Sequence, residues 1–255
     1  MKKITSYQII TILATLLTIV VNGLANALPI NGQGTGEISD RFAVLFVPAG
    51  YVFSIWGLIY LALIAYTVYQ VLPAQRDNHL LKKIAPAYWI GSAANTIWIF
   101  LWHYEVFPLT VVFMVAILAA LLFIYRQFSE AKSDLNRNQK LFIKLPFSIY
   151  LGWISVATIA NVAQVLFYLN WGGWGISPAV WTVIMLVIAA ILGLLMQLRE
   201  HDWLYVLVLV WAFVGIAVKQ AEMALIANTA WAAAGVLVLV VVIFPFLNRR
   251  KGAAE

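Results

Sequence analysis

Eight apolar stretches of roughly 20 residues each divide this chain, and short polar breaks separate them. A stretch of that length crosses the hydrocarbon core of a bilayer as an α-helix, because a helix bonds its backbone N–H and C=O groups internally. The pattern predicts an all-α fold, a polytopic transmembrane helix bundle. The expected spans are residues 9–27, 51–72, 84–102, 107–125, 145–169, 178–198, 203–218 and 223–247.

The proportion of apolar residues excludes a water-soluble fold. Hydrophobic residues make up 64% of the chain and charged residues 10%, and the mean hydropathy is +0.93. A soluble domain is about half apolar and a quarter charged, so the excess apolar surface must face lipid. The sequence contains no cysteine, which excludes disulfides, thiolate metal sites and cysteine nucleophiles.

The first apolar stretch follows a short basic segment and ends in small residues at 25–27, as a signal peptide would. It is longer than the core of a typical signal peptide and carries Asn22 and Gly23. We interpret it as a retained first helix.

The positive charges predict the orientation of the spans, because Lys and Arg collect in cytoplasmic loops. With the N-terminus in the cytoplasm and eight spans, fourteen of the sixteen Lys and Arg residues are cytoplasmic, and only Arg41 and Lys219 are external. The net charge of +6 is therefore interpreted as a signal for membrane orientation, and a nucleic-acid partner is not expected. Both termini are expected in the cytoplasm.

The last two spans leave an alternative open. The stretch 203–218 is short, and only a thin polar break at Lys219, Gln220 and Glu222 precedes the next one. One long kinked helix, or a re-entrant pair, would satisfy the same pattern and would move the C-terminal tail outside.

The loop 28–48 differs in composition from the other loops. Gly and Asn residues at 31–36 permit tight turns, and apolar residues at 42–47 suggest that the loop folds back onto the helices. We interpret the loop as an external lid. A mobile surface loop is the alternative.

The chain shows no catalytic constellation. His79, His103 and His201 fall on opposite sides of the bilayer in this topology and cannot share a metal site. Acidic residues are confined to loops and helix ends, whereas proton-coupled transport usually places an ionisable group within the membrane. We therefore assign no catalytic and no metal-binding residues.

Aromatic and amide side chains recur at helical spacing within three of the spans. Pairs four residues apart share a helix face, and flat rings with a few polar groups suit a planar apolar ligand. Core packing explains the rings equally well, and bonding between helices explains a membrane Asn. The candidate ligand-binding residues are Tyr51, Phe53, Trp56, Tyr60, Asn95, Trp98, Trp153, Ala157 and Asn161.

Three motifs containing these residues resemble the TspO/MBR family of tryptophan-rich sensory proteins. They are VPAGYVFSIWGLIY at 47–60, ANTIW at 94–98, and YLGW at 150–153 followed by Ala157, Thr158 and Asn161. The three occur in the order of the family's second, third and fifth helices. The resemblance covers residues 1–169, the expected five-helix core, and leaves 170–255 as additional helices with a basic cytoplasmic tail.

The chain also departs from the family pattern. The second-helix motif is one residue short between Phe53 and Trp56, has Tyr51 where the family has Trp, and is preceded by one proline, Pro48. Residues 167–178 contain no Lys or Arg, so the cholesterol motif proposed for the family, itself a weak pattern, has no counterpart.

The resemblance implies a pocket beneath the lid that binds porphyrins and other planar hydrophobic ligands, with a sensory, regulatory or transport-linked role. It implies that no cofactor is obligatory and that porphyrin or haem is a ligand, with a sterol-like molecule as a further candidate. It also implies a homodimer surrounded by membrane lipids. The expected location is the bacterial inner membrane. A secondary transporter of a small metabolite is the alternative, and a photochemical tetrapyrrole-degrading enzyme is a third reading.

Reporter fusions test the orientation. We expect fusions after Gln75, Ser133 and Lys251 to report the cytoplasm, and a reporter inserted after Gly34 to report the outside, because this arrangement keeps fourteen positive charges inside. An external signal at Lys251 alone would remove one span from the final region. An external signal at Ser133 would overturn the whole scheme.

Overall fold

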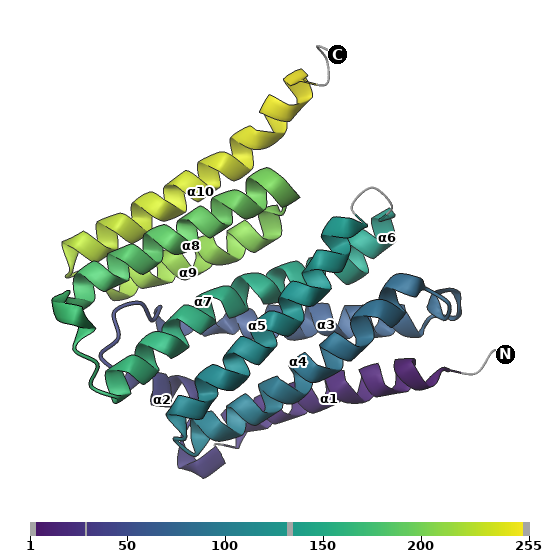
Figure 1. Cartoon of the computed structure of the whole chain (residues 1–255), viewed down its shortest axis with the longest axis horizontal. Helices are drawn as coiled ribbons and strands as arrows, with labels where there is room; N and C mark the ends of the chain where they lie inside the picture. The colour runs from purple at the N-terminus through teal and green to yellow at the C-terminus, as the bar shows by residue number, and fades with distance from the viewer. Residues whose placement is uncertain (1–3, 29, 132–134, 252–255) are drawn as a thin grey trace. The chain divides into compact units, whose positions relative to one another are not determined.

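The computed structural model describes residues 4–28, 30–131 and 135–251; most of these residues are helical, and none of them lies in a strand (Figure 1). Seven helices in the described part are long and apolar enough to cross a membrane. An eighth, α9, has 17 residues, short of the roughly 20 that a span usually needs. The expected all-α membrane bundle is confirmed. These seven helices and α9 contain, in chain order, α1 (Ser6–Ala27), α3 (Ile55–Val71), α4 (His79–His103), α5 (Phe107–Glu130), α7 (Leu145–Tyr168), α8 (Pro178–Glu200), α9 (Trp203–Lys219) and α10 (Ala224–Lys251).

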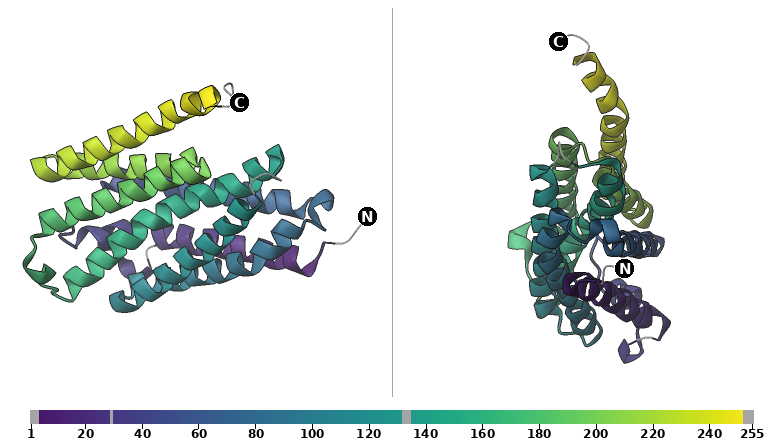
Figure 2. Two further views of the ribbon diagram at one scale, coloured as in Figure 1. Left: turned by 45° about the horizontal axis from the view of Figure 1, so that its top comes forward. Right: turned by 90° about the vertical axis from the view of Figure 1, so that its right-hand side faces the viewer.

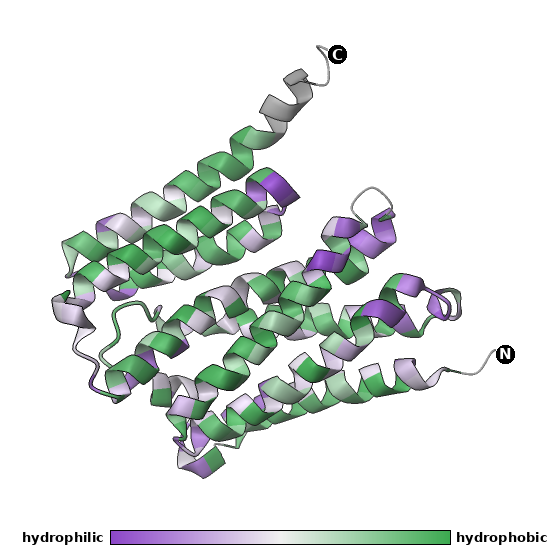
Figure 3. Ribbon diagram, in the orientation of Figure 1, coloured by the Kyte–Doolittle hydropathy of each residue, from purple (hydrophilic) through white to green (hydrophobic). Residues whose placement is uncertain are grey.

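Short helical turns connect these elements. The expected lid contains η1 (Ile30–Gly32) and α2 (Thr35–Asp40), and its residue 29 lies outside the described residues. The other turns are η2 (Gly50–Ser54), η3 (Pro73–Gln75), α6 (Arg137–Gln139), η4 (Lys140–Lys144) and η5 (Gly173–Gly175). Hydrophobic residues line the lengths of the long helices and hydrophilic ones gather near their ends (Figure 3).

The chain forms two compact units. The first comprises Met1–Phe42 and Ser54–Ile154, and the second comprises Ala43–Phe53 and Ser155–Glu255. The division falls within α7, and the boundary expected after residue 169 stays a prediction. In the second unit, Tyr205 Oη of α9 donates a hydrogen bond to Ser155 Oγ of α7 at 3.0 Å.

In the first unit, α4 packs against both α1 and α5, and these helices run side by side in each view (Figures 1 and 2). The contact with α5 is close at Gly91, where a Cβ atom would lie 3.3 Å from Ala120 Cβ. The small side chains at this point let the two backbones approach, as is typical of helix pairs in membranes.

Helix α1 is amphipathic in the sense opposite to a soluble helix. Its buried residues are nearly all polar, and Leu13, Leu16 and Val20 are among its exposed ones. These polar residues bond to two neighbouring helices. On α3, Gln70 O accepts from Gln8 Nε2, and Thr67 Oγ1 lies 2.7 Å from Thr15 Oγ1. On α4, Tyr88 Oη lies 2.7 Å from Thr15 Oγ1, Trp89 Nε1 donates to Thr11 Oγ1, and Asn95 Oδ1 accepts from Asn22 Nδ2 at 2.6 Å. The apolar face of α1 suits contact with lipid, and its polar face suits hydrogen bonding to neighbouring helices.

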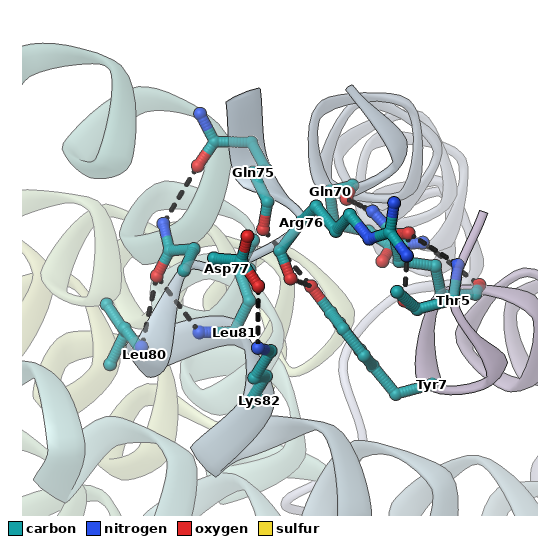
Figure 4. Close-up of polar contacts among 11 residues, drawn as sticks. Thr5, Tyr7, Gln70, Gln75, Arg76, Asp77, Leu80, Leu81 and Lys82 are labelled. Atoms are coloured by element: carbon teal, nitrogen blue, oxygen red, sulfur yellow. Dashed lines mark hydrogen bonds and ion pairs between the residues drawn. The ribbon is translucent and has the colours of Figure 1, made fainter. Parts of the chain in front are cut away.

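The turn between α3 and α4 is fixed from two sides (Figure 4). Tyr7 Oη of α1 donates to the carbonyls of Gln75 and Arg76 at 3.1 and 3.0 Å. Asn78 Oδ1 caps α4 by accepting from the N–H groups of Leu80 and Leu81, which α4 itself cannot satisfy.

In the second unit, α8, α9 and α10 pack against one another and lie side by side in Figures 1 and 2. Gly193 of α8 faces Leu237 of α10, and a Cβ atom at Gly193 would lie 3.0 Å from Leu237 Cδ2.

The amide pair between α1 and α4 provides a test of packing in the first unit. We expect Asn22→Leu to lower the free energy of unfolding by about 1 to 2 kcal/mol, because Asn95 Oδ1 loses its donor in a buried site. The double variant Asn22→Leu/Asn95→Leu should lose less than the sum of the two single variants, since neither amide is then stranded. Denaturant titration in detergent measures this, with exposed Asn26→Leu as the control, and additive losses would contradict it.

Candidate functional site

Four aromatic side chains of the first unit meet between α3 and α7, and we call Trp56, Tyr60, Tyr150 and Trp153 the aromatic cluster. Trp56 stacks on Tyr60 with ring centroids 5.7 Å apart and an angle of 22° between the rings. Trp56 also meets Tyr150 and Trp153 edge to face, at 6.0 and 6.2 Å. Spacings of four residues on α3 and three on α7 place each pair on one helix face.

The two helices bury their rings to different extents. Tyr150 is 4% exposed and Trp153 2% exposed, whereas Trp56 and Tyr60 are only partly buried. The two rings of α7 are therefore the buried side of the cluster, and the two rings of α3 keep accessible surface.

The hydroxyl of Tyr150 has an unusual environment for a buried group. Tyr150 Oη has no hydrogen-bond partner among the described residues, and an unpaired buried hydroxyl costs about 1 to 3 kcal/mol. Tyr150 also lines a cavity of about 10 Å³ between α4, α5 and α7, together with Tyr88 and Ser92, which is about the room that one water occupies. An incoming polar group or a water would relieve this cost.

A second group of rings lies at the end of α4. Trp98 stacks on Trp102 at 5.4 Å, Trp102 meets Phe107 edge to face at 5.3 Å, and Phe42 contacts both Trp102 and Phe107. Trp98, one of the candidate ligand-binding residues, belongs to this second group. The structure stacks it on its own helix neighbour, beneath the chain segment that follows α1.

That chain segment, residues 30–42, is held on α4 by His103 and Trp102, and we call it the lid segment. His103 is fully buried, its Nδ1 lies 3.0 Å from Ile30 O, and its Nε2 lies 3.0 Å from Thr35 Oγ1. A neutral imidazole with its hydrogen on Nδ1 donates to the carbonyl and accepts from the hydroxyl. Asn31 Nδ2 donates to His103 O, and Trp102 Nε1 donates to Thr35 O.

A surface ion pair adds to this attachment. Arg41 Nη2 lies 2.9 Å from Glu105 Oε1, and Gln33 Nε2 donates to the same oxygen at 3.3 Å. Hydrogen bonds from Arg41 and then Gln33 lower the pKa of Glu105 below its ordinary value. The pair therefore persists above the ordinary carboxyl pKa and is lost only as the pH falls through the lowered one.

The remaining predicted site residues occupy other environments. Asn95 accepts the hydrogen bond from Asn22, which is the helix-bonding role that the sequence left open. In the second unit, Tyr51 meets Trp211 edge to face at 5.3 Å. Phe53 and Ala157 are partly buried and Asn161 is buried in that unit.

Sequence reasoning did not assign site roles to Tyr150 and His103. Tyr150 could have been found from its spacing of three from Trp153, which places both on one face. His103 follows Trp102 at a helix end, and no local pattern indicates that a distant loop will bury it.

A family model described as TSPO-like protein matches residues 8–243 of this chain. The matched span runs from α1 through α8 and α9 and into α10. Searches of curated proteins and of solved structures found no match.

The attachment of the lid segment gives a prediction for His103. We expect His103→Leu to increase amide hydrogen exchange in residues 30–42 by about tenfold or more, because two hydrogen bonds to Ile30 and Thr35 are lost together. Exchange in α5 should not change, and His79→Leu, at the start of α4, should leave the lid segment as in the parent. Unchanged exchange at 30–42 in His103→Leu would show that other contacts hold the segment.

Proposed function

Because this chain belongs to the TSPO-like protein family, we propose that it binds porphyrins or other planar hydrophobic ligands at its aromatic cluster. The chain is an integral membrane protein of the TspO family. The observation that carries the proposal is the combination of stacked, partly accessible rings at Trp56 and Tyr60 with the buried Tyr150 hydroxyl, which has no hydrogen-bond partner in the part of the chain that the structure describes.

The chemistry of the cluster suits a flat ligand with a polar edge. Offset stacking and edge-to-face contacts favour a planar π-system, and burial of an aromatic surface is favourable in proportion to its area. The Tyr150 hydroxyl would donate to a carboxylate or carbonyl of the ligand. The four members of the cluster carry no imidazole, thiolate or thioether, so binding by stacking does not depend on a metal in the macrocycle.

The wider role that we propose is sensory, regulatory or transport-linked, at the bacterial inner membrane with both termini in the cytoplasm. The distribution of Lys and Arg along the chain supports this orientation. Membrane lipids would surround the exposed leucines of α1, and a homodimer and a sterol-like ligand belong to the same proposal.

Porphyrin titration of Trp153→Leu tests the location of the site. We expect the dissociation constant for protoporphyrin, followed by tryptophan fluorescence, to rise by about ten- to a hundred-fold, since burial of an aromatic ring against a ligand is worth about 1 to 3 kcal/mol. Trp231→Leu, at a half-exposed residue of α10, should bind as the parent does. Parent-like binding by folded Trp153→Leu and Trp56→Leu variants would place the ligand elsewhere.

Tyr150→Phe tests the polar contact separately from the stacking. We expect it to weaken protoporphyrin binding by about tenfold, because a hydrogen bond to a charged group contributes about 1.5 kcal/mol or more. Affinity for etioporphyrin, which has no carboxylate, should stay the same, and the free energy of unfolding should not fall, because the hydroxyl has no hydrogen-bond partner among the described residues. Equal weakening for both porphyrins would argue for a change in packing instead.

A further inference from the structure

Segment 43–53 of the second unit, which we call the strap, joins the lid segment to α3. Residues 43–49 are irregular, and η2 at Gly50–Ser54 leads directly into α3. Its apolar residues Phe46, Val47 and Val52 are 2%, 1% and 0% exposed. A buried irregular backbone in a membrane protein needs partners for its N–H and C=O groups, because lipid supplies none.

Helix α9 supplies those partners along one side. Trp211 Nε1 donates to Val52 O at 3.0 Å, and Gln220 Nε2, one residue beyond the helix, donates to Leu45 O at 3.2 Å. Ala49 N donates to Gly215 O at 3.1 Å. All three hydrogen bonds are made to backbone atoms of the strap, so they fix its backbone conformation independently of its side chains.

Gly215 makes this contact sterically possible. A Cβ atom at this position would overlap Val52 Cγ2 and would lie 3.1 Å from Pro48 Cβ. Trp211 lies one helical turn earlier on the same face, and its ring meets Tyr51 edge to face at 5.3 Å. The strap therefore packs directly against the face of α9 that carries Gly215 and Trp211.

We propose that α9 clamps the strap and thereby positions the start of α3, so that Trp211, Gly215 and Gln220 are positioning residues for Trp56. The constraint is transmitted through the covalent chain, because Phe53 is held in the clamped segment and Trp56 follows three residues later in a continuous helical run. The consequence for ligand affinity rests on the proposed function. The clamp and its effect on α3 do not.

The absence of cysteine allows a direct test with a single introduced thiol. Val47→Cys places that thiol on the buried side of the strap, and maleimide should label it slowly. Adding Gly215→Val should raise the labelling rate by about tenfold or more, because the added side chain takes the space of Val52 and displaces the strap. Gly235→Val is the matched control, because a Cβ atom at Gly235 meets nothing within 4 Å.

A second variant guards against misfolding of Gly215→Val. Trp211→Phe removes one hydrogen bond to the strap and keeps an aromatic ring, so labelling at Val47→Cys should rise by about threefold to tenfold. Hydrogen exchange in residues 55–60 should rise in both variants and stay at the parent level in Gly235→Val. Unchanged labelling would overturn the clamp, and faster labelling with unchanged exchange at 55–60 would overturn the positioning of α3.

Protoporphyrin binding to the same variants separates this proposal from the proposed function. If the parent binds, the clamp variants should bind more weakly and release porphyrin faster, and Gly235→Val should match the parent. Parent-like affinity in the clamp variants would overturn the role of α9 in positioning Trp56. If the parent does not bind porphyrin, the proposed function fails, and the labelling and exchange results decide the clamp.

Discussion

The need to satisfy every backbone N–H and C=O group away from water governs this molecule. Helices meet that need internally, which is why most of the described residues are helical. The irregular segments meet it through side chains of neighbouring helices. His103 and Trp102 bond to carbonyls of the lid segment, and Trp211 and Gln220 bond to carbonyls of the strap.

The same constraint explains why polar residues lie inside the first unit. An apolar outer face is favourable in lipid, but lipid provides no hydrophobic force between helices. The specific pairing of helices therefore depends on hydrogen bonds and close packing. Threonines and amides of α1 meet Tyr88 and Asn95 of α4, and Gly91 brings α4 against α5. The pairing of α4 with α1 and with α5 therefore does not use the rings of the aromatic cluster, which lie on α3 and α7.

Helical periodicity predicted the parts of this structure that depend on one helix at a time. The pairs Trp56 with Tyr60 and Trp98 with Trp102 stack as their spacing of four residues indicates, and every expected span contains a helix. Contacts between distant segments were beyond that reasoning. No spacing indicated that Trp102 would meet Phe42 and Phe107, that His103 would bond to the lid segment, or that Gly215 of α9 would pack against the strap. Each of these contacts depends on tertiary geometry.

The position of the strap also changes how the C-terminal helices should be understood. Motifs within residues 47–161 carried the resemblance, so the later helices looked like an appendage to a five-helix core. An appendage would leave the strap complete without it, yet three hydrogen bonds of the strap end on α9 or on Gln220 just beyond it, and the family match includes these helices. A strap whose backbone partners lie on α9 would be left with unsatisfied buried groups if α9 were removed. The C-terminal helices are therefore part of what determines the conformation of the segment that enters α3, and with it the presentation of Trp56.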